Sequence, residues 1–375
     1  MAPAIGQDMK SYIGLYPKVC SIENLELAFK KARKGKTQKP YVIAFEQNLK
    51  DNLAALRAEL LFHSYRPLPL KEFVIRDPKT RKISVSDFRD RIVHHAICNI
   101  IEPIYDKTFI YDSYANRKGK GTMMAVYRLD NFIRKVSKNG TAVLKSNNRC
   151  VRGFCLKGDI RHYFENISHK RLIDMLKRTI EDEDLIFLIN SILVNHNHLK
   201  GMPLGNLTSQ FFANVYLNEM DQFVKHSLKA KYYIRYVDDF VILHNNRRVL
   251  ESYLERINTF LVNSLHLELN HDKSSIKPLS RGIEFLGFRI FYHHKLLRER
   301  NIRSAYKRIN DFKVQYQLTE TNYDAVYNFV QGWLAYAKNA NTYAVRTSLS
   351  EFATQLFPNE VSSIEVNRLL KSSKL

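Results

Sequence analysis

The sequence lacks the cysteine pattern of a secreted, disulfide-rich protein. It has four cysteines in 375 residues, Cys20, Cys98, Cys150 and Cys155, without the dense and even spacing of a disulfide scaffold. No second Cys/His pair stands near Cys150 and Cys155 to complete a zinc site. We therefore expect reduced thiols and a cytoplasmic protein.

Long apolar runs and a secretion signal are also missing. The first residues, MAPAIGQDMKSYIG, have no basic segment followed by an apolar core. The longest apolar stretch, Leu185 to Val194, is interrupted by Asn190 and is too short to span a bilayer. The chain shows no internal repeat and no low-complexity linker. We expect no membrane partner.

Acidic residues are few compared with basic ones. Lys+Arg number 59 and Asp+Glu 37, which gives a net charge of +22. Such a surplus favours a polyanionic partner, and nucleic acid is the first candidate. A basic membrane-surface protein or a ribosome-associated protein would show the same surplus. A chain of 375 residues also exceeds what one hydrophobic core usually fills, so we expect two or three subdomains around a shared cleft.

Hydrophobic periodicity predicts an α+β fold. Apolar residues three and four apart over 42–60 predict one helix, and short alternating runs on either side of Asp77-Pro78-Lys79 predict a basic β-hairpin. Helical spacing returns over Arg91–Tyr105 and again after about residue 300. Between them the pattern predicts, in order, a strand into Asp159, helices from Ser168 and over 204–227, a hairpin at 231–244, a helix at 247–265 and short strands at 275–292.

Two adjacent aspartates stand between two apolar runs. Tyr236-Val237-Asp238-Asp239-Phe240 lies between Tyr232-Tyr233-Ile234 and Val241-Ile242-Leu243, which predicts a hairpin with both acids at its tip. Neighbouring carboxylates repel each other unless a cation lies beside them. An ordinary turn that contains aspartate would have the same local sequence.

A third acid, Asp159, ends the predicted strand Phe154–Ile160. Placed opposite the hairpin, it would complete a cradle of three carboxylates. Hard oxygen ligands of this kind select Mg²⁺. Two such ions, roughly 3.5 to 4 Å apart, suit nucleotidyl transfer because they activate the attacking 3′-oxygen and neutralise the leaving pyrophosphate.

Six motifs follow one another along the chain. They are Arg81 with Arg89-Asp90-Arg91, Asp159 with Tyr163-Phe164, Gly205-x-x-x-Ser209, Tyr-Val-Asp238-Asp239, Leu-Asn270-x-x-Lys273 and Phe285-Leu286-Gly287-Phe288. In this order and spacing, over about residues 70 to 290, they resemble the consecutive sequence blocks of reverse transcriptases. The resemblance implies a right-hand polymerase fold: fingers at 1–150, a palm of antiparallel strands backed by helices at 151–295, and a helical thumb at 296–375.

The resemblance also implies a chemistry, RNA-directed DNA polymerisation. Asp159, Asp238 and Asp239 would be the catalytic acids. Together with Ile160 they would form the site of two Mg²⁺ ions, with Asp239 as the weaker ligand.

Five residues would handle the incoming deoxynucleoside triphosphate. Arg81 and Arg91 would hold the triphosphate from the fingers hairpin, because a planar guanidinium suits phosphate. Lys273 would protonate the leaving pyrophosphate, although a lone lysine after Asn-x-x is also a common surface charge. Phe164, or Tyr163 if the register is one residue off, would exclude the ribose 2′-hydroxyl.

A basic glycine loop precedes the predicted palm. Tyr111–Gly121 contains Arg117, Lys118 and Lys120 between residues that allow close backbone approach, so we expect these cations to contact nucleic-acid phosphates. Basic residues of the fingers and thumb would likewise follow an RNA/cDNA duplex, with an affinity that weakens as salt rises.

One motif narrows the resemblance. Where this family usually has Gln-Gly-x-x-x-Ser-Pro, the chain has Leu204-Gly205-Asn206-Leu207-Thr208-Ser209-Gln210. Leucine and glutamine at these two positions resemble the reverse transcriptases of diversity-generating retroelements, which are bacterial or phage-encoded. We expect Leu204, Gly205, Ser209 and Gln210 to set fidelity, with Leu204 at the start of a helix beneath the nascent base pair.

That subclass copies a template-repeat RNA and misincorporates opposite adenine, so that the cDNA diversifies a target gene. It works with a small basic pentameric accessory protein. The alternatives are a group II intron maturase, whose additional segments we do not find after the thumb-like helices, a retron enzyme, and a defence-associated reverse transcriptase. A catalytically silent RNA-binding protein on the same scaffold is the alternative from another class.

Overall fold

A computed structural model describes residues 11–76, 80–145, 148–197 and 199–366, without the side chains of 142–150. The predicted turn Asp77-Pro78-Lys79 and the side chain of Cys150 lie outside this description. The helices described, in chain order, are α1 (Tyr16–Val19), α2 (Ile22–Ala32), α3 (Pro40–Gln47), α4 (Leu49–Leu61), α5 (Phe88–Tyr105), α6 (Thr122–Ser137), α7 (Tyr163–Asn166), α8 (His169–Lys177), α9 (Glu183–Val194), α10 (Leu207–Gln222), α11 (Arg247–Phe260), α12 (Glu299–Gln317), α13 (Tyr323–Ala337) and α14 (Tyr343–Leu356).

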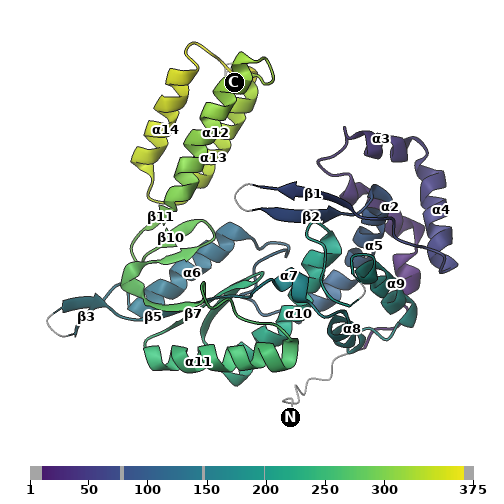
Figure 1. Cartoon of the computed structure of the whole chain (residues 1–375), viewed down its shortest axis with the longest axis horizontal. Helices are drawn as coiled ribbons and strands as arrows, with labels where there is room; N and C mark the ends of the chain where they lie inside the picture. The colour runs from purple at the N-terminus through teal and green to yellow at the C-terminus, as the bar shows by residue number, and fades with distance from the viewer. Residues whose placement is uncertain (1–10, 77–79, 146–147, 198, 367–375) are drawn as a thin grey trace, which may run out of the picture. The chain divides into compact units, whose positions relative to one another are not determined.

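Strands alternate with these helices, so the chain is α+β as predicted (Figure 1). The strands described are β1 (Lys71–Ile75), β2 (Arg81–Val85), β3 (Ala142–Lys145), β4 (Asn148–Val151), β5 (Phe154–Asp159), β6 (Tyr232–Tyr236), β7 (Asp239–His244), β8 (Ser275–Pro278), β9 (Ile283–Phe285), β10 (Phe288–Ile290) and β11 (Lys295–Leu297). None of the described helices is long and apolar enough to cross a membrane.

The chain divides into two compact units. The first comprises Met1–Ala125, Leu156–Ile242 and Arg248–Ile276, and the second Val126–Cys155, Leu243–Arg247 and Lys277–Leu375. Every residue that the sequence assigns to catalysis, nucleotide binding or fidelity belongs to the first unit.

Helix α5 forms the helical core of the first unit, where it packs against α2 and α10. Its apolar face, which includes Ile92, Val93 and Ala96, is fully buried. At its N-terminus the side chain of Asp87 accepts a hydrogen bond from the amide of Arg89, which satisfies a donor that the helix leaves free. The predicted helix over Arg91–Tyr105 is therefore confirmed, three residues longer than predicted.

The basic hairpin β1–β2 is antiparallel, with Phe73 opposite Ile83 (Figure 1). Its base rests on the segment that leads into α10. The amide of Ser84 donates to the carbonyl of Leu204 at 3.1 Å, and the amide of Ser86 donates to Oδ1 of Asn206 at 3.2 Å. The hairpin is thus fixed at its base by the motif that contains Gly205.

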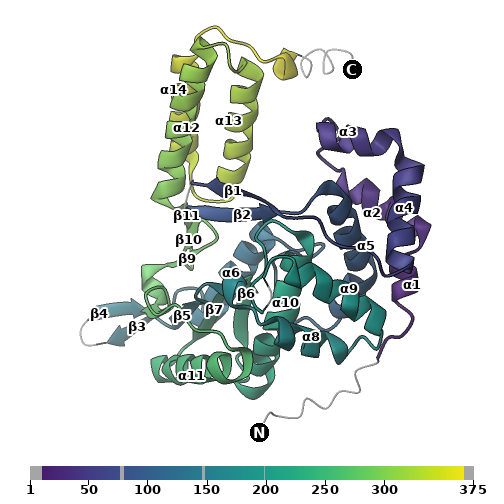
Figure 2. The ribbon, with the colours of Figure 1, turned by 45° about the vertical axis from the view of Figure 1, so that its right-hand side comes forward.

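A four-stranded sheet in the order β6-β7-β5-β8 carries Asp159 at the end of β5 and Asp239 at the start of β7. Figure 2 labels β5, β6 and β7 of this sheet. Close packing of its two inner strands depends on Gly158. A Cβ at this position would lie 2.2 Å from the ring of Phe240, so only glycine lets the ring pack over β5.

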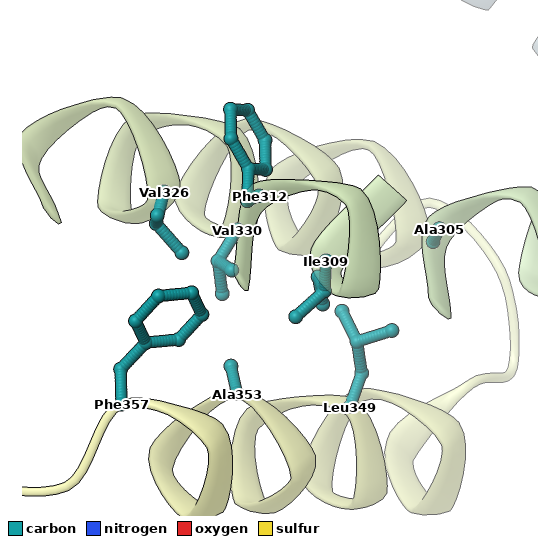
Figure 3. Close-up of a cluster of buried hydrophobic side chains, with 8 residues drawn as sticks. All are labelled: Ala305, Ile309, Phe312, Val326, Val330, Leu349, Ala353 and Phe357. Atoms are coloured by element: carbon teal, nitrogen blue, oxygen red, sulfur yellow. The ribbon is translucent and has the colours of Figure 1, made fainter. Parts of the chain in front are cut away.

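The second unit contains a three-stranded antiparallel sheet, β11-β10-β9, and a helical bundle. In both ribbon views α12, α13 and α14 lie side by side (Figures 1 and 2). Figure 3 shows that most of their buried apolar side chains, Ile309, Val326, Val330, Leu349, Ala353 and Phe357, are turned toward one another. The buried cluster consists of Ala305, Ile309, Phe312, Val326, Val330, Leu349, Ala353 and Phe357. Partly buried aromatics, among them Tyr316, Tyr323 and Trp333, pack against this cluster.

Two predicted helix boundaries are wrong. The single helix over 42–60 is two helices, α3 and α4, because Asn48 between them has a non-helical backbone (φ −119°, ψ 43°). The helix predicted from Leu204 begins at Leu207, because Gly205 has a φ of +123°, which no helix accommodates. Its predicted end is confirmed, since α10 continues into a π-helical turn over Phe223–Ser227.

Candidate active site

The turn between β6 and β7 presents two of the acids. Val237 has a φ of +55°, a left-handed conformation that β-branched residues rarely adopt. The bend at Val237 forms the turn, and Asp238 and Asp239 come directly after it at the tip, where both side chains are half-buried. The predicted hairpin over 231–244 is confirmed.

Asp159 ends β5 and is 7% exposed. Its main chain is held by the loop that immediately precedes β8. The amide of Asp159 donates to Oγ of Ser274 at 3.3 Å, and its carbonyl accepts from the amide of Asn270 at 2.8 Å. The same loop carries Lys273, whose Nζ donates to Oδ1 of Asp159 at 2.7 Å. The Asn-x-x-Lys motif thus places its lysine directly on the first acid.

The three acids form one electrostatic cluster. Burial, together with the charges of Asp239 and Asp159, raises the pKa of Asp238 to about 6. Burial also raises the pKa of Asp239, while Lys157, whose Nζ lies 3.7 Å from its Oδ1, opposes that rise. Carboxylates that disfavour their own ionisation in this way favour a bound cation.

The donor chemistry of this cluster fits a hard divalent cation, because all three acids offer carboxylate oxygens and ammonium groups now lie against two of them. Ile160, the fourth residue predicted at the metal site, is buried and bridges Leu269 in an antiparallel pair beside Asp159. Among the described residues, no group of three or more His, Cys, Asp or Glu side chains is arranged to hold a metal ion.

The two predicted triphosphate ligands come from different elements. Arg81 is exposed at the start of β2, on the hairpin. Arg91 lies in the first turn of α5 rather than on the hairpin, where its Nε donates to the carbonyl of Ser86 at 2.8 Å and its guanidinium covers the ring of Tyr41.

The aromatic pair after Asp159 differs in exposure. Tyr163 is 3% exposed, and its hydroxyl donates to the carbonyl of Ala213 at 2.6 Å. Phe164 is half-buried and has its ring edge-on to that of Tyr163. The side chain with a free face is therefore Phe164.

The basic loop uses two of its cations, Arg117 and Lys120, to hold its own shape. The side chain of Arg117 is 8% exposed and donates to Asp106, Ile110 and Ser113. Lys120 donates to the carbonyl of Tyr111 at 2.6 Å and lies over that ring. Lys118 is exposed to solvent.

The fidelity residues surround the start of α10. Leu204 is half-buried and precedes the helix, while Ser209 is buried inside its first turn. The amide of Gln210 donates to the carbonyl of Asn206 at 3.3 Å, a bond that the proline usual at this position does not form.

Sequence reasoning assigned no role to Lys157, Asn206 or Arg235. Arg235 is fully buried in β6, and a charged residue inside an apolar strand is a usable signal because it requires a partner. Lys157 stands two residues before Asp159 on the same strand and is half-buried beside Asp239. The sequence gives no indication of a role for Asn206, because its hydrogen-bond partner, the amide of Ser86, is distant in sequence and meets it only in the folded chain.

Comparison with known proteins gives a family match. The protein-family model described as "Reverse transcriptase (RNA-dependent DNA polymerase)" matches residues 75–290, more than half of the chain. Protein YkfC of Escherichia coli is 29% identical over 291 residues, which cover 66% of this chain and 72% of that protein. The group II intron-encoded protein LtrA of Lactococcus lactis is 24% identical over 300 residues, which cover 60% of this chain and 47% of LtrA.

The chain thus spans less than half the length of the intron-encoded relative. Among solved structures, apo telomerase from Candida tropicalis aligns with a TM-score of 0.46 and 13% identity, covering 64% of this chain and 59% of the telomerase chain.

Proposed function

Because the chain belongs to the reverse transcriptase (RNA-dependent DNA polymerase) family, we propose that it copies RNA into DNA with Asp159, Asp238 and Asp239 as its catalytic acids. The observation that supports this proposal is the electrostatic interaction of Asp159, at the end of β5, with Asp238 and Asp239, at the β6–β7 turn.

The three acids, with Ile160 beside them, would hold two Mg²⁺ ions. Bound there, the ions would activate the primer 3′-oxygen and neutralise charge on the pyrophosphate. The protein's own residues do the rest. Lys273, which donates a hydrogen bond to Asp159, would protonate the leaving pyrophosphate, and the guanidinium groups of Arg81 and Arg91 would hold the triphosphate.

The proposed partners are a template RNA, the RNA/cDNA duplex and deoxynucleoside triphosphates. The net charge of +22 supports them, and exposed Lys118 with Lys120 would contact phosphates. We further propose that residues 1–150, 151–295 and 296–375 act as fingers, palm and thumb. We also propose that the protein acts in the bacterial cytoplasm and that its gene belongs to a bacterium or to a phage.

We also propose a subclass, the error-prone reverse transcriptase of a diversity-generating retroelement with its pentameric accessory protein. The support is Leu204 and Gln210 in the motif around Gly205 and Ser209. Leucine offers no hydrogen bond to a misaligned base pair, whereas glutamine does. A group II intron-type enzyme is the second candidate, and the similarity to LtrA favours it.

The experiment for polymerase activity is primer extension on RNA with Mg²⁺. Asp238→Asn with Asp239→Asn should abolish nucleotide incorporation and leave RNA binding nearly intact, because the acids hold metal and the basic surface holds RNA. The control is Glu268→Gln with Asp272→Asn, which removes the same charge from two exposed residues. Full activity in the first variant would end the proposed mechanism.

The experiment for the subclass is sequencing of cDNA made on a defined template. We expect frequent errors opposite adenine and few opposite the other bases, with fewer errors in Leu204→Gln. The matched control is Leu207→Gln, the same substitution at another half-buried leucine three residues later, which should not change fidelity. Uniform low error on all four template bases would remove the retroelement assignment and leave the polymerase.

A further inference from the structure

A buried arginine lies directly behind the turn that carries two of the acids. Arg235 and Asp221 have fully buried side chains, and the guanidinium donates to both carboxylate oxygens, from Nε at 2.8 Å and from Nη2 at 2.6 Å. A bidentate pair of this kind is geometrically rigid. An apolar pair would fill the same space without the loss of hydration that two buried charges suffer, so filling space does not account for this pair.

The remaining guanidinium nitrogen reaches the turn itself. Nη1 of Arg235 donates to the carbonyl of Val237 at 3.0 Å and to Oδ1 of Asn214 at 3.2 Å. Val237 is the residue with the left-handed φ of +55°. Its peptide group leads directly into Asp238, so a hydrogen bond to this carbonyl fixes the orientation of the unit that carries both acids.

The arginine is itself held on all sides. Asp221 and Asn214 both belong to α10, and the hydroxyl of Tyr233 donates to Oδ1 of Asp221 at 2.6 Å. The main chain of Arg235 is fixed as well, because its amide donates to the carbonyl of Asp112 and its carbonyl accepts from the amide of Tyr114. Helix α10 and the edge of the sheet thus form a rigid frame behind the turn.

We propose that Arg235 is a positioning residue for catalysis: anchored by Asp221, it holds the Val237 carbonyl so that Asp238 and Asp239 face the metal site together. The inference rests on the proposed polymerase function, since it assigns those two acids to metal binding. It predicts that the arginine's geometry matters, and not only its charge.

Arg235→Lys tests the geometry. Lysine retains the charge opposite Asp221, but a single ammonium group cannot bind both carboxylate oxygens and the Val237 carbonyl. We expect primer-extension kcat to fall roughly 10- to 100-fold, as a small misplacement of catalytic groups does, and the Mg²⁺ concentration for half-maximal rate to rise several-fold. RNA affinity should stay within about twofold, since the basic surface is unchanged.

The matched control is Tyr105→Phe, which removes one buried hydrogen bond, to the carbonyl of Leu176, that does not belong to the Arg235 network. It should lower the melting temperature and leave both kcat and the Mg²⁺ dependence unchanged. If Arg235→Lys yields no folded protein, Asn214→Ala carries the test, because it keeps the ion pair and removes one of the two acceptors of Nη1, together with the bond from Asn214 Nδ2 to the carbonyl of Ala115. We expect a smaller shift of the Mg²⁺ dependence in the same direction.

The outcomes separate the two proposals. If the wild-type protein extends a primer and Arg235→Lys, or Asn214→Ala in its place, has an unchanged Mg²⁺ dependence and kcat, the positioning role is wrong and the polymerase stands. If the wild-type protein incorporates no nucleotide at any Mg²⁺ concentration, the proposed function itself fails.

Discussion

Tyr163 and Phe164 are adjacent aromatic residues that differ in how far their side chains are exposed to a substrate. The hydroxyl of Tyr163 is used inside the fold, on the carbonyl of Ala213, and its ring is buried. Phe164 is only half-buried. Of the two registers that the sequence leaves open for the residue that excludes a ribose hydroxyl, this difference favours Phe164.

Phe164→Ala should therefore admit ribonucleotides, because it removes the steric wall next to the sugar. We expect discrimination between deoxyribo- and ribonucleotides to fall roughly 10- to 100-fold, the scale at which one apolar contact distinguishes substrates. Single-nucleotide extension with each sugar measures it. Tyr163→Phe is the control and should cost about 1 kcal/mol of stability without changing sugar choice. Selectivity kept in Phe164→Ala but lost in Tyr163→Ala would move the register by one residue.

His94 makes the first unit sensitive to acid. It is 2% exposed within α5, and burial, together with the charges of His95 and Arg91, lowers its pKa to about 3. The unfolded chain, with an ordinary histidine pKa of about 6.5, takes up a proton that the folded protein resists. Stability is therefore complete above about pH 6.5 and is lost as pH falls toward 3.

At pH 5 this loss amounts to about 2 kcal/mol for one such histidine. Between pH 7.5 and pH 5, the melting temperature of His94→Leu should fall less than that of the wild-type protein. His271→Leu, which removes an exposed histidine, is the control. An equal acid-induced drop in His94→Leu and the wild-type protein would show that other groups cause the sensitivity.

The hairpin β1–β2 and the segment before α10 act as a connected pair of elements. Gly205 lies against the hairpin with a φ of +123°, and a Cβ there would meet Cγ2 of Ile83 at 3.1 Å and the carbonyl of Ser84 at 3.3 Å. A side chain at this position therefore pushes on the strand that begins with Arg81. The hairpin's position and nucleotide binding should change together.

Gly205→Ala should raise the KM for deoxynucleoside triphosphates roughly tenfold, because the proposed triphosphate ligand Arg81 shifts with its strand. Gly121→Ala is a matched control: its φ of +131° gives the same backbone strain, but a Cβ there meets nothing within 4 Å. Steady-state extension on saturating primer-template measures both. Equal KM values for the two variants would show that backbone strain, and not contact with the hairpin, determines the effect.

The elements that sequence reasoning located correctly are those whose signal is local. The hairpins over 71–85 and 232–244 follow from alternating runs around polar turns, and the paired acids follow from the turn between two apolar strands. The break at Asn48 was missed because apolar spacing continues across it. The start of α10 was misplaced because the φ of Gly205 depends on its contact with β2, which the sequence does not state.

The role of Arg235 shows what a local pattern does not contain. Its partner Asp221 lies on a helix, and its third contact is a main-chain carbonyl, so no spacing of residue types encodes the arrangement. The reverse holds for Arg117: its sequence context indicates a phosphate ligand, but the folded loop uses its donors internally. Tertiary contacts decide which cations remain available.

At the scale of the whole molecule, the surplus of 22 positive charges predicts how RNA binding responds to salt. Each phosphate neutralised by a protein cation releases condensed counterions, so the logarithm of affinity falls linearly with the logarithm of salt concentration. For a duplex the slope is about −0.9 per phosphate contact. A net charge spread over the surface gives no such slope unless particular side chains meet phosphates.

Lys118 and Arg117 provide the comparison. Lys118→Gln should reduce the salt slope by about one and weaken binding to all RNA sequences alike, because an exposed ammonium group acts as a phosphate contact. Arg117→Gln should mainly lower the melting temperature, since its guanidinium ties the loop to Asp106 and Ile110. Filter binding of one RNA duplex at several salt concentrations measures the slopes. A slope that changes only in Arg117→Gln would reverse the assignment and make the folded arrangement of this loop, rather than Lys118, the determinant of RNA affinity.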